Sequence, residues 1–461
     1  MHEPVRILWN SQDIDKITGG ESTVPWVCSG ISIDTRTLAK GDLFVALKGE
    51  KGEGELFLEN AYEKGAVAAL ASHVSKVPLP QLVVKDTLRA LEKLGIAARE
   101  RSNAKRIAIT GSVGKTSTKD MLKVILKDQG LTHGSVSSYN NHWGVPLTLA
   151  RMPEKTEFGI FEVGMNHPGE IRPLTHMIKP HIAIITTVVE AHAEFFTTEE
   201  DIARAKAEIF EAMEKGAPVL LNADNAHYSL LSRLALEKGL KVYSFGQSKE
   251  ADFRLLSWEG KEEESQIMVE IQGETLSYSL PVPGLHWALN SLAALGGVSL
   301  AGADVKKAAY SLAILKPPSG RGQWYKGDFT VIDESYNANP TSMKAALTVL
   351  GKSGQGRKIA VIGDMRELGS LSKQRHEELL ECLLENKIDL VFCCGPYMAS
   401  LFASLPHSLR GGYAPTSLEL MPLVLKEVQS GDIVSVKASL GTRVKPIVEA
   451  LLVLQEKKRV G

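Results

Sequence analysis

This sequence of 461 residues lacks long apolar runs, excess charge of either sign and abundant cysteine. We expect no membrane-spanning helix, because no run reaches about 18 apolar residues. The formal net charge of −1 gives no basic footprint for nucleic acid or an anionic membrane. The N-terminal MHEPVRILWN has no apolar core of signal-peptide length. We therefore expect a cytoplasmic, monomeric protein that binds neither nucleic acid nor membrane.

The four cysteines are too few and too poorly spaced for a disulfide framework or a metal-binding motif. Cys393 and Cys394 are neighbours in the apolar run DLVFCCG. Successive side chains of a strand point to opposite faces, so these two thiols are expected to enter two different apolar layers. We predict buried, reduced cysteines, as is usual in a reducing compartment.

The order of apolar runs predicts the fold class, which is α/β with three domains. Runs such as FGIFEVG (158–164) and HIAIITTVV (181–189) alternate with helical spacing, which favours a mostly parallel sheet covered on both faces. Residues 251–281 instead have the pattern of an antiparallel β insertion, and 197–216 has that of one capped helix ending at a glycine. The polar SNAK (102–105) and the Pro- and Gly-rich LKPPSGRGQ (315–323) are expected joints. The predicted domains are a small α/β unit (1–103), a central P-loop domain with the β insertion (104–316) and a C-terminal Rossmann-like domain (317–461).

The stretch RIAITGSVGKTSTKD (106–120) predicts a phosphate-binding loop between a strand and a helix. Its two glycines let the backbone approach an anion, which the loop amides, Lys115 and the helix N-terminus then face. Thr116 places a hydroxyl where a nucleotide's Mg²⁺ is bound in such loops. Ile109 stands where a strict Walker A motif has glycine, and a structural glycine turn is the alternative interpretation. The predicted phosphate-binding residues are Gly111, Ser112, Val113, Gly114, Lys115, Thr116 and Ser117.

Two further residues, Glu162 and His192, could supply metal ligands near that loop. Glu162 ends an apolar strand in FEVGMNHPGE, where a carboxylate can hold Mg²⁺ directly or through water. His192 follows another apolar strand in VVEAHAEFF and could also reach the metal, or could simply pack there. Lys206, in RAKAEIF, is expected from its spacing alone to be a solvated lysine.

Polar residues beyond the second joint are candidates for ligand contact. The segment DESYNANP (333–340) runs from a strand end into a turn and a helix, and it gathers Asp333, Asn337 and Asn339 there. Arg321 is flanked by glycines that would let its guanidinium approach a phosphate. Asn290 is a polar residue in an otherwise apolar helix, where it could contact a base or only satisfy the backbone.

Together these segments resemble the Mur ligase family, the ATP-dependent amide-forming enzymes of peptidoglycan synthesis. The resemblance covers nearly the whole chain and is strongest to the member that joins D-alanyl-D-alanine to UDP-N-acetylmuramoyl-tripeptide. GDMRELG (363–369) is again similar to that enzyme, and the DNPR stretch expected of the member that adds the third amino acid is absent. The matching segments, in order, are TGSVGKTS (110–117), YNNHWGVP (139–146), FEVGMNHPGEI (161–171), AHAEFF (191–196), RAKAEIF (204–210), GLHWALNSLAA (284–294), SGRGQ (319–323) and DESYNANP (333–340).

The resemblance implies a mechanism and a set of residue roles. ATP would phosphorylate the substrate carboxylate, with two Mg²⁺ ions, and the amine of the dipeptide would displace phosphate from the acyl phosphate. The first domain would bind the UDP end, the central domain ATP, and the third domain would close over both. The implied catalytic residues are Lys115, Glu162, His192 and Lys206, the last as a CO₂-derived carbamate that ligates the second metal with His192. The implied ligand contacts are Ser32, Asp34, Thr35 and Arg36 for the UDP substrate; Asn290 for the base, Arg321 for phosphate and Asp333 for ribose or adenine; and Tyr336, Asn337 and Asn339 for the acceptor.

Two departures from the family pattern, and the competing interpretations, stay open at this point. Residues 53–55 read Glu-Gly-Glu where the family often has Asp-Gly-His, and Leu440 stands where a basic residue is usual, with Arg443 and Lys445 the nearest basic residues downstream. A folylpolyglutamate synthetase-like ligase is the nearest alternative, although ISIDTRTLAKGDLFVAL (31–47) belongs to a UDP-substrate module. A P-loop regulatory NTPase is the alternative from another class, and it predicts ATP hydrolysis without any amine acceptor.

Overall fold

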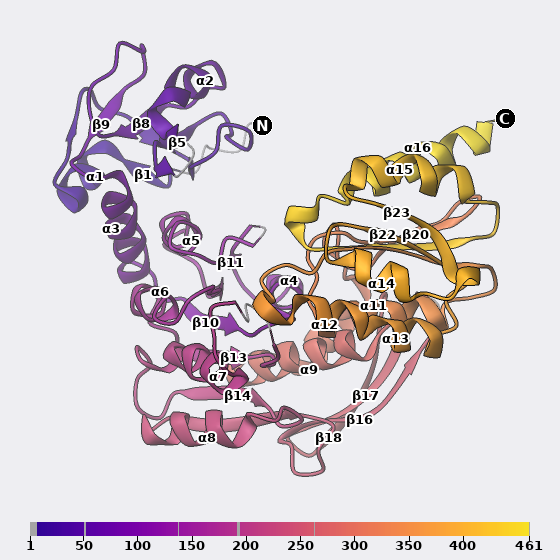
Figure 1. The fold of residues 1–461 in the computed structure, drawn as a ribbon. Helices are drawn as coiled ribbons and strands as arrows, with labels where there is room; N and C mark the ends of the chain where they lie inside the picture. Colours follow the sequence, from indigo (N-terminus) through magenta and orange to yellow (C-terminus); the bar gives the residue numbers. More distant parts are fainter. Residues whose placement is uncertain (1–6, 50–51, 137, 191–193, 262, 461) are drawn as a thin grey trace.

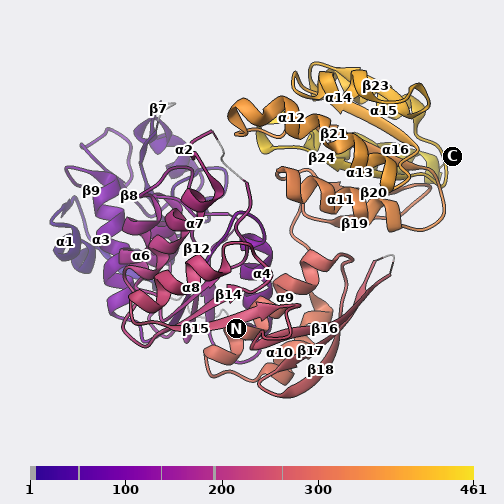
Figure 2. The same ribbon diagram turned by 60° about the horizontal axis from the view of Figure 1, so that its bottom comes forward.

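The fold consists of three α/β domains that follow one another along the chain, as the sequence predicted (Figure 1). The structure is a computed structural model that describes residues 7–49, 52–136, 138–190, 194–261 and 263–460. In both views the first and third domains stand on different parts of the central one, with the C-terminal domain above α9 and the β16–β18 strands in the view of Figure 1 (Figures 1 and 2). The exact limits 1–103, 104–316 and 317–461 remain predictions.

The first domain is a small five-stranded sheet with short helices. Strands β4, β5, β8 and β9 are parallel, and β2 pairs with β9 in the antiparallel sense. Gly54–Phe57 forms a 3-10 turn (η1) directly before α2 begins. The sheet order is β2 (Glu21–Ser22), β9 (Gln81–Val83), β8 (Ala68–Ala71), β5 (Asp42–Val45) and β4 (Gly30–Ser32), accompanied by the pairs β1 (Trp9–Asn10) with β3 (Val27–Cys28) and β6 (Lys48–Gly49) with β7 (Gly52–Glu53), and by α1 (Ser11–Thr18), α2 (Leu58–Glu63) and α3 (Thr87–Glu100).

A shared apolar cluster attaches the first domain to the central one. Leu91, Leu94 and Ala98 of α3 are fully buried, and they belong to the same cluster as Leu147 and Ala150 of α5 (Gly144–Ala150) in the central domain. Asp86 caps the N-terminus of α3 by accepting from two backbone amides of its first turn. The amphipathic stripe of α3 therefore belongs to an interdomain core as well as to its own domain.

The central domain is a nine-stranded sheet that is parallel through its first seven strands. β15 and β16 pair in the parallel sense, so the predicted β insertion is not a separate unit: β16, β17 and β18 extend the main sheet as an antiparallel meander. The strand order is β11 (Thr132–Gly134), β12 (Phe158–Glu162), β10 (Lys105–Thr110), β13 (Ile182–Ile185), β14 (Pro218–Asn222), β15 (Lys241–Gly246), β16 (Phe253–Gly260), β17 (Ser265–Ile271) and β18 (Glu274–Leu280).

Helices cover both faces of this sheet, which explains why its parallel strands are continuous apolar runs. One buried cluster joins the sheet to α4 and α9, and another joins its opposite face to α5, α6 and α7. The helices other than α5 are α4 (Lys115–Lys127), α6 (Ile171–Ile178), α7 (Glu199–Ala207), α8 (Tyr228–Glu237), α9 (Leu285–Leu300) and α10 (Val305–Ser311), with 3-10 turns η2 (Glu208–Phe210) and η3 (Leu312–Ile314).

The single helix predicted over 197–216 is wrong in its length. α7 begins as expected, with Thr198 and Asp201 forming a reciprocal capping box, but it ends at Ala207. The chain then tightens into a 3-10 turn because Glu208 is nearly buried and its carboxylate accepts from the backbone N–H groups of Gly169 and Arg172. A tertiary contact of one buried carboxylate therefore ends a helix that local propensity would continue.

The C-terminal domain is a doubly wound sheet of six strands. Only β19 is antiparallel, on the edge beside β20. The strand order is β19 (Gln323–Tyr325), β20 (Thr330–Glu334), β24 (Ile433–Lys437), β21 (Lys358–Gly363), β22 (Leu390–Cys394) and β23 (Arg410–Ala414), and the helices are α11 (Pro340–Lys352), α12 (Ser372–Glu377), α13 (Leu379–Glu385), α14 (Met398–Ser404), α15 (Ser417–Glu427) and α16 (Lys445–Val460), with 3-10 turns η4 (Gly369–Leu371), η5 (His407–Leu409) and η6 (Leu440–Thr442).

The paired cysteines of β22 confirm the prediction made for them. Cys393 belongs to the apolar cluster on one face of the C-terminal sheet, and Cys394 belongs to the cluster on the other. All four cysteines of the chain are free and buried. Burial raises the pKa of Cys394 to about 12, so this thiol is held in its inert, protonated form.

Candidate active site

The phosphate loop lies between β10 and α4, at the carboxyl edge of the central sheet. Gly111 and Gly114 both have positive φ, 148° and 89°, which a side chain would strain. A Cβ at Gly114 would also come within 2.5 Å of Oδ1 of Asn290, which α9 presents to the loop. The glycines are therefore required by both backbone conformation and space, and Asn290 lies directly against the loop.

Lys115 is folded back over the loop that it follows. Its Nζ donates to the carbonyl oxygen of Gly111 at 2.6 Å and lies 3.4 Å from that of Ser112. The pKa of Lys115 is lowered, chiefly by burial, against the opposing field of Glu162. An arriving anion would supply the countercharge that this buried ammonium needs.

A buried hydrogen-bond network joins the loop to the neighbouring strand. β12 pairs with β10 in a register that sets Glu162 beside Ile109, one step before the loop. Thr116 Oγ1 donates to Glu162 Oε2 at 2.9 Å, and Asn140 Nδ2 donates to Glu162 Oε1 at 2.8 Å. Glu162 is only 1% exposed, so its carboxylate is held in one orientation by partners from two other segments.

The oxygen donors of this network fit a hard divalent cation. Mg²⁺ is usually held by one or two protein oxygens together with waters and phosphate oxygens, and the hydroxyl of Thr116 and the carboxylate of Glu162 provide that set. Within the described part of the chain, no group of three or more His, Cys, Asp and Glu side chains could form a metal site. His192, the other ligand expected from the sequence, lies outside the described residues.

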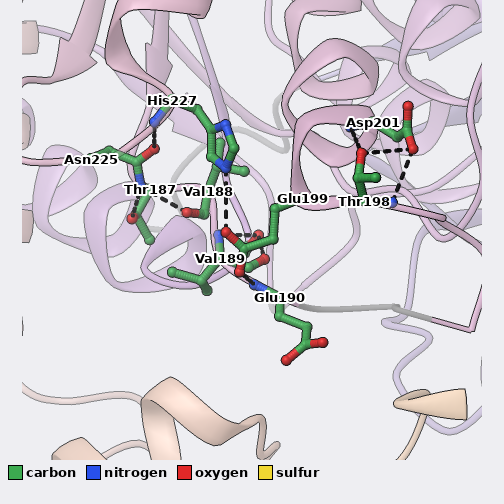
Figure 3. Close-up of polar contacts among 10 residues, drawn as sticks. Thr187, Val188, Val189, Glu190, Thr198, Glu199, Asp201, Asn225 and His227 are labelled. Carbon is green, nitrogen blue, oxygen red and sulfur yellow. Dashed lines mark hydrogen bonds and ion pairs between the residues drawn. The ribbon is translucent and has the colours of Figure 1, made fainter. Parts of the chain in front are cut away.

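The segments on either side of that histidine are anchored by hydrogen bonds (Figure 3). Ser112 Oγ donates to the carbonyl oxygen of Val189 at 2.8 Å, which links the phosphate loop to the end of this segment. The backbone N–H of Glu190 donates to the carboxylate of Glu199 at 2.9 Å, while the Glu190 side chain points away from that contact. Glu199 also lies 3.3 Å from Nε2 of His227, so α7 and α8 both brace the segment.

Lys206 is buried, which overturns the expectation of a solvated lysine. It lies in α7 with 2% of its surface exposed, and its side chain has no hydrogen bond or ion pair with any other described residue. Its pKa is lowered well below the ordinary value, first by burial and then by the charge of Lys115. Burial of this kind favours the neutral amine, which is the form that reacts with CO₂.

A cavity of about 420 Å³ lies above the loop and is closed on its far side by the C-terminal domain. The guanidinium of Arg321 stacks over the ring of Tyr336 at 4.0 Å. Asn337 and Asn339, from the turn between β20 and α11, line the same cavity, and Asn339 caps α11. The structure thus brings the predicted acceptor residues, and the predicted nucleotide residues other than Gly111 and Asp333, to one cavity.

Asp333 has a different place from the one its predicted nucleotide contact suggests. It is fully buried, its carboxylate accepts from Lys445 Nζ at 2.6 Å and from the backbone N–H of Gly320 at 3.1 Å, and it does not line the cavity. It therefore fixes the interdomain joint in this arrangement. The neighbouring Glu334 lines the cavity instead, paired with Lys437 at 3.1 Å.

The residues expected to bind the UDP substrate lie at the end of β4 and in the loop after it, and none of them lines the cavity above the phosphate loop. Asp34 pairs with Arg36 at 2.6 Å, and this contact lowers the pKa of the Asp34 carboxyl. Ser32 Oγ donates to the carbonyl oxygen of Asp34 at 3.0 Å, and Lys64 Nζ donates to that of Thr35 at 2.7 Å. The loop is thus preformed, with the guanidinium of Arg36 facing solvent.

Sequence reasoning did not assign roles to three side chains that shape this site: Asn140, Ser138 and Lys437. Asn140 lies in YNNHWGVP, which the family resemblance had already singled out as a segment. Ser138 Oγ is 3.2 Å from Thr116 Oγ1, and Lys437 is buried beside Glu334. Only the long-range pairing of strands could reveal them, because each meets a partner distant in sequence.

The phosphate loop, the buried carboxylate of Glu162 and the C-terminal domain beside the cavity are together the features of an α/β enzyme that binds a nucleotide and transfers its phosphate. Three family descriptions match the chain: "Mur ligase family, catalytic domain" at residues 27–125, "Mur ligase middle domain" at 109–298 and "Mur ligase, glutamate ligase domain" at 320–440. The chain belongs to the Mur ligase family and is a ligase.

Curated relatives match over nearly their whole length. One from Rickettsia prowazekii, named UDP-N-acetylmuramoyl-tripeptide--D-alanyl-D-alanine ligase, is 34% identical over 447 residues, or 96% of this chain and 99% of the relative. A relative of the same name from Bacillus subtilis is 34% identical and covers 92% of this chain and 93% of its own. The sequence-based resemblance is therefore confirmed at the level of the family.

Solved structures match the fold as closely. MurF from Acinetobacter baumannii has a TM-score of 0.84 at 28% identity, covering 96% of this chain and 98% of its own. MurF ligase from Thermotoga maritima, solved in complex with ADP, has a TM-score of 0.77 at 26% identity, covering 93% and 98%. A folylpolyglutamate synthase from Mycobacterium tuberculosis shares only the fold, at 16% identity and a TM-score of 0.59. The folylpolyglutamate and regulatory-NTPase alternatives thus gain no support, and no helix in the described ranges is long and apolar enough to cross a membrane.

Proposed function

We propose that this ligase joins D-alanyl-D-alanine to UDP-N-acetylmuramoyl-tripeptide at the expense of ATP, a step of peptidoglycan precursor synthesis. Full-length relatives carry that activity in their names, and a structural neighbour was solved with ADP. The observation that carries the proposal is the Thr116–Glu162–Asn140 network, which faces a cavity closed by Arg321 and Tyr336. The phosphate loop lines this cavity from the central domain, where phosphates would bind. Tyr336, Asn337 and Asn339 line it from the C-terminal domain, where the acceptor would bind.

The chemistry needs an activated carboxylate. The terminal carboxylate oxygen of the tripeptide attacks the γ-phosphorus of ATP, the bond from that phosphorus to the bridging oxygen breaks, and ADP and an acyl phosphate form. The amine of the dipeptide then attacks the acyl carbon, the carbon–oxygen bond to phosphate breaks, and the amine proton is lost to solvent. Such a phosphoryl transfer depends on positioning and charge neutralisation more than on covalent help from the protein.

The residues of the phosphate loop supply that positioning. The backbone amides of 111–114 and the N-terminus of α4 face the phosphates, and Lys115 releases its carbonyl partners to neutralise the γ-phosphate. Thr116 and Glu162 would hold Mg²⁺, which when bound would offset charge on the phosphates. Asn290 and Arg321, which line the cavity, are assigned to the nucleotide, whereas the contact of Asp333 with ribose or adenine stays a prediction because Asp333 is buried outside the cavity lining.

We assign Lys206 to a second metal site, close to the phosphate loop. Its burial and lack of a described partner are consistent with a carbamate formed on its neutral amine, which would give the oxygen ligands of a second cation. His192 is assigned to the same cation. These two assignments remain predictions, as do the monomeric state and the cytoplasmic location. Two sets of substrate contacts also remain predictions: those of the UDP substrate with Ser32, Asp34, Thr35 and Arg36, and those of the acceptor with Tyr336, Asn337 and Asn339.

Substrate-dependent phosphate release tests the proposal. The purified chain is supplied with ATP, Mg²⁺ and the UDP-linked tripeptide, with and without D-alanyl-D-alanine. Sustained release that requires both substrates is the expected result. Release that ignores both would overturn the proposal and restore the regulatory-NTPase reading.

A further inference from the structure

A second cavity, of about 260 Å³, lies beside the first and is shared between two domains. Ser112 and Asn166 line it from the central domain, and three turns of the C-terminal domain line it from the other side. Ser112, Asn166 and the turn at 336–339 also line the nucleotide cavity, so the two spaces meet at the phosphate loop. A molecule in the second cavity would therefore have one end at the place where phosphate is transferred.

Arg366 is the one cationic side chain among the described residues that line this second cavity. Its side chain has no ion pair with any described residue, and it lies in the GDMRELG segment, in which Met365 and Leu368 belong to the buried core but the Arg366 side chain has no role yet assigned. A Cβ at Gly441 would come within 2.6 Å of its Nη1. The guanidinium therefore packs against Gly441, where any larger residue would clash with it. The guanidinium thus lines the cavity together with the acidic Glu367, and the charge of Asp364 lies near enough to interact with it.

The backbone that carries Arg366 is fixed by contacts to three other segments. Its N–H donates to Ser439 Oγ at 2.9 Å, and that hydroxyl donates in turn to the carbonyl oxygen of Ala338 at 3.1 Å. One residue earlier, the N–H of Met365 donates to His376 Nε2 at 2.9 Å. The backbone at Arg366 is therefore held beside the turn at 336–339, which limits the positions that its side chain can reach.

The rest of the second cavity suits a small amphiphilic peptide. Leu368 and Leu440 supply apolar surface, and Leu440 is 63% exposed, where methyl groups could cover it. Ser112 lines this cavity from the phosphate loop, and Arg366 lines it from the C-terminal domain. A guanidinium matches a carboxylate in charge and in bidentate geometry, which a lysine at the same place would not.

We propose that Arg366 binds the terminal carboxylate of the incoming dipeptide and so selects acceptors with a free C-terminus. The inference rests on the proposed ligase function. It assigns the dipeptide a direction, with its amine toward the phosphate loop and its carboxylate on the C-terminal domain. Arg366 acts on binding and specificity, and it takes no part in the bond-making steps.

The test compares two acceptors, D-alanyl-D-alanine and D-alanyl-D-alaninamide, whose C-terminus is uncharged. Phosphate release is measured for the wild type, Arg366→Gln, Arg366→Lys and the control Lys373→Gln. Lys373 is an exposed cation of the same domain, 76% exposed and only 3.9 Å from Glu377, so the control removes one positive charge outside the cavity. Arg366→Gln should fold normally, within about 2 °C of the wild-type melting temperature, because its side chain has no described ion-pair partner.

The expected result is a KM for D-alanyl-D-alanine that rises about 10- to 100-fold in Arg366→Gln, since a charge-assisted hydrogen-bonded pair is lost. The KM values for ATP and the UDP substrate should not change, Arg366→Lys should recover part of the loss, and Lys373→Gln should match the wild type. The preference of the wild type for the acid over the amide should disappear in Arg366→Gln. An equal loss for both acceptors, or no loss, would overturn the inference. Phosphate release by the wild type at the same rate without any acceptor would instead overturn the proposed function itself.

Discussion

Arg375 Nε donates to the carboxylate of Glu190 at 2.5 Å, so an ion pair joins α12 of the C-terminal domain to the segment after β13. Glu190 is held at its backbone by Glu199, which leaves its side chain free to reach the other domain (Figure 3). A second contact lies close by, since the N–H of Glu194 donates to the carbonyl oxygen of Glu367 at 3.2 Å. At this edge of the site, the contact between the central and C-terminal domains thus includes a few polar interactions.

Breaking this pair should weaken catalysis modestly. Arg375→Ala is expected to lower kcat/KM up to about fivefold, because a partly exposed ion pair contributes about 1 kcal/mol or less. Glu190→Ala should have a similar effect, and the double variant should be no worse than either single one. Additive losses in this double-mutant cycle, measured by steady-state phosphate release, would show that the two residues act separately.

Glu162 is predicted to be indispensable for turnover but not for folding. Glu162→Gln keeps the shape of the side chain and can still bond to Thr116 and Asn140, yet it removes the charge that would hold Mg²⁺. Turnover should fall by at least about 100-fold, as expected when charge stabilisation of phosphoryl transfer is lost. The exposed Glu154→Gln serves as control, and titration of activity with Mg²⁺ provides the readout. A variant with normal turnover at ordinary Mg²⁺ would contradict the assigned role.

Lys206 should be required as a carbamate rather than as a cation. Lys206→Ala is expected to lose nearly all activity and to regain part of it with short carboxylic acids, which would replace the carbamate oxygens. Lys206→Arg should be equally inactive, because it keeps a positive charge but cannot capture CO₂. Wild-type turnover by the alanine variant, or full activity of the arginine variant, would remove the carbamate from the mechanism.

His133 makes the fold sensitive to acid. Burial lowers its pKa from 6.5 to about 4, while its Nε2 keeps a 2.7 Å contact with the carbonyl oxygen of Thr148. Between those two pH values the unfolded chain binds a proton that the folded chain does not, so the stability contributed above pH 6.5 is lost as the pH falls toward 4. Urea midpoints measured from pH 7 to 4 should fall less steeply for His133→Gln than for the wild type. The exposed His407→Gln is the control, and identical slopes for His133→Gln and wild type would contradict the prediction.

Local sequence patterns were sufficient for the architecture. The apolar runs at 106–110 and 158–162 predict parallel strands, and the structure pairs them in the register that places Glu162 beside the phosphate loop. The β meander after 251 was recognised, but its continuity with the main sheet was not, because the β15–β16 pairing depends on a tertiary register. The end of α7 was missed for a similar reason, since the partners of Glu208 are about forty residues away in sequence.

The candidate site was predictable where a residue acts through its own motif. Lys115 and Thr116 belong to a loop whose chemistry is local; Lys115 folds back over that loop, and Thr116 contacts Glu162. Lys206 was different, because helical spacing cannot tell that several elements pack around one lysine and exclude water from it. Arg366 and Lys437 gain their positions only when turns of the C-terminal domain are brought together, so no local pattern identifies them.

The most direct measurement is phosphate release by the purified chain in the presence of ATP, Mg²⁺ and UDP-N-acetylmuramoyl-tripeptide. Adding D-alanyl-D-alanine should start steady turnover with one phosphate released per amide bond formed, and mass spectrometry should find the UDP-linked pentapeptide. Omitting either substrate should stop it. Phosphate release at the same rate without the dipeptide, or without any pentapeptide product, would contradict the account.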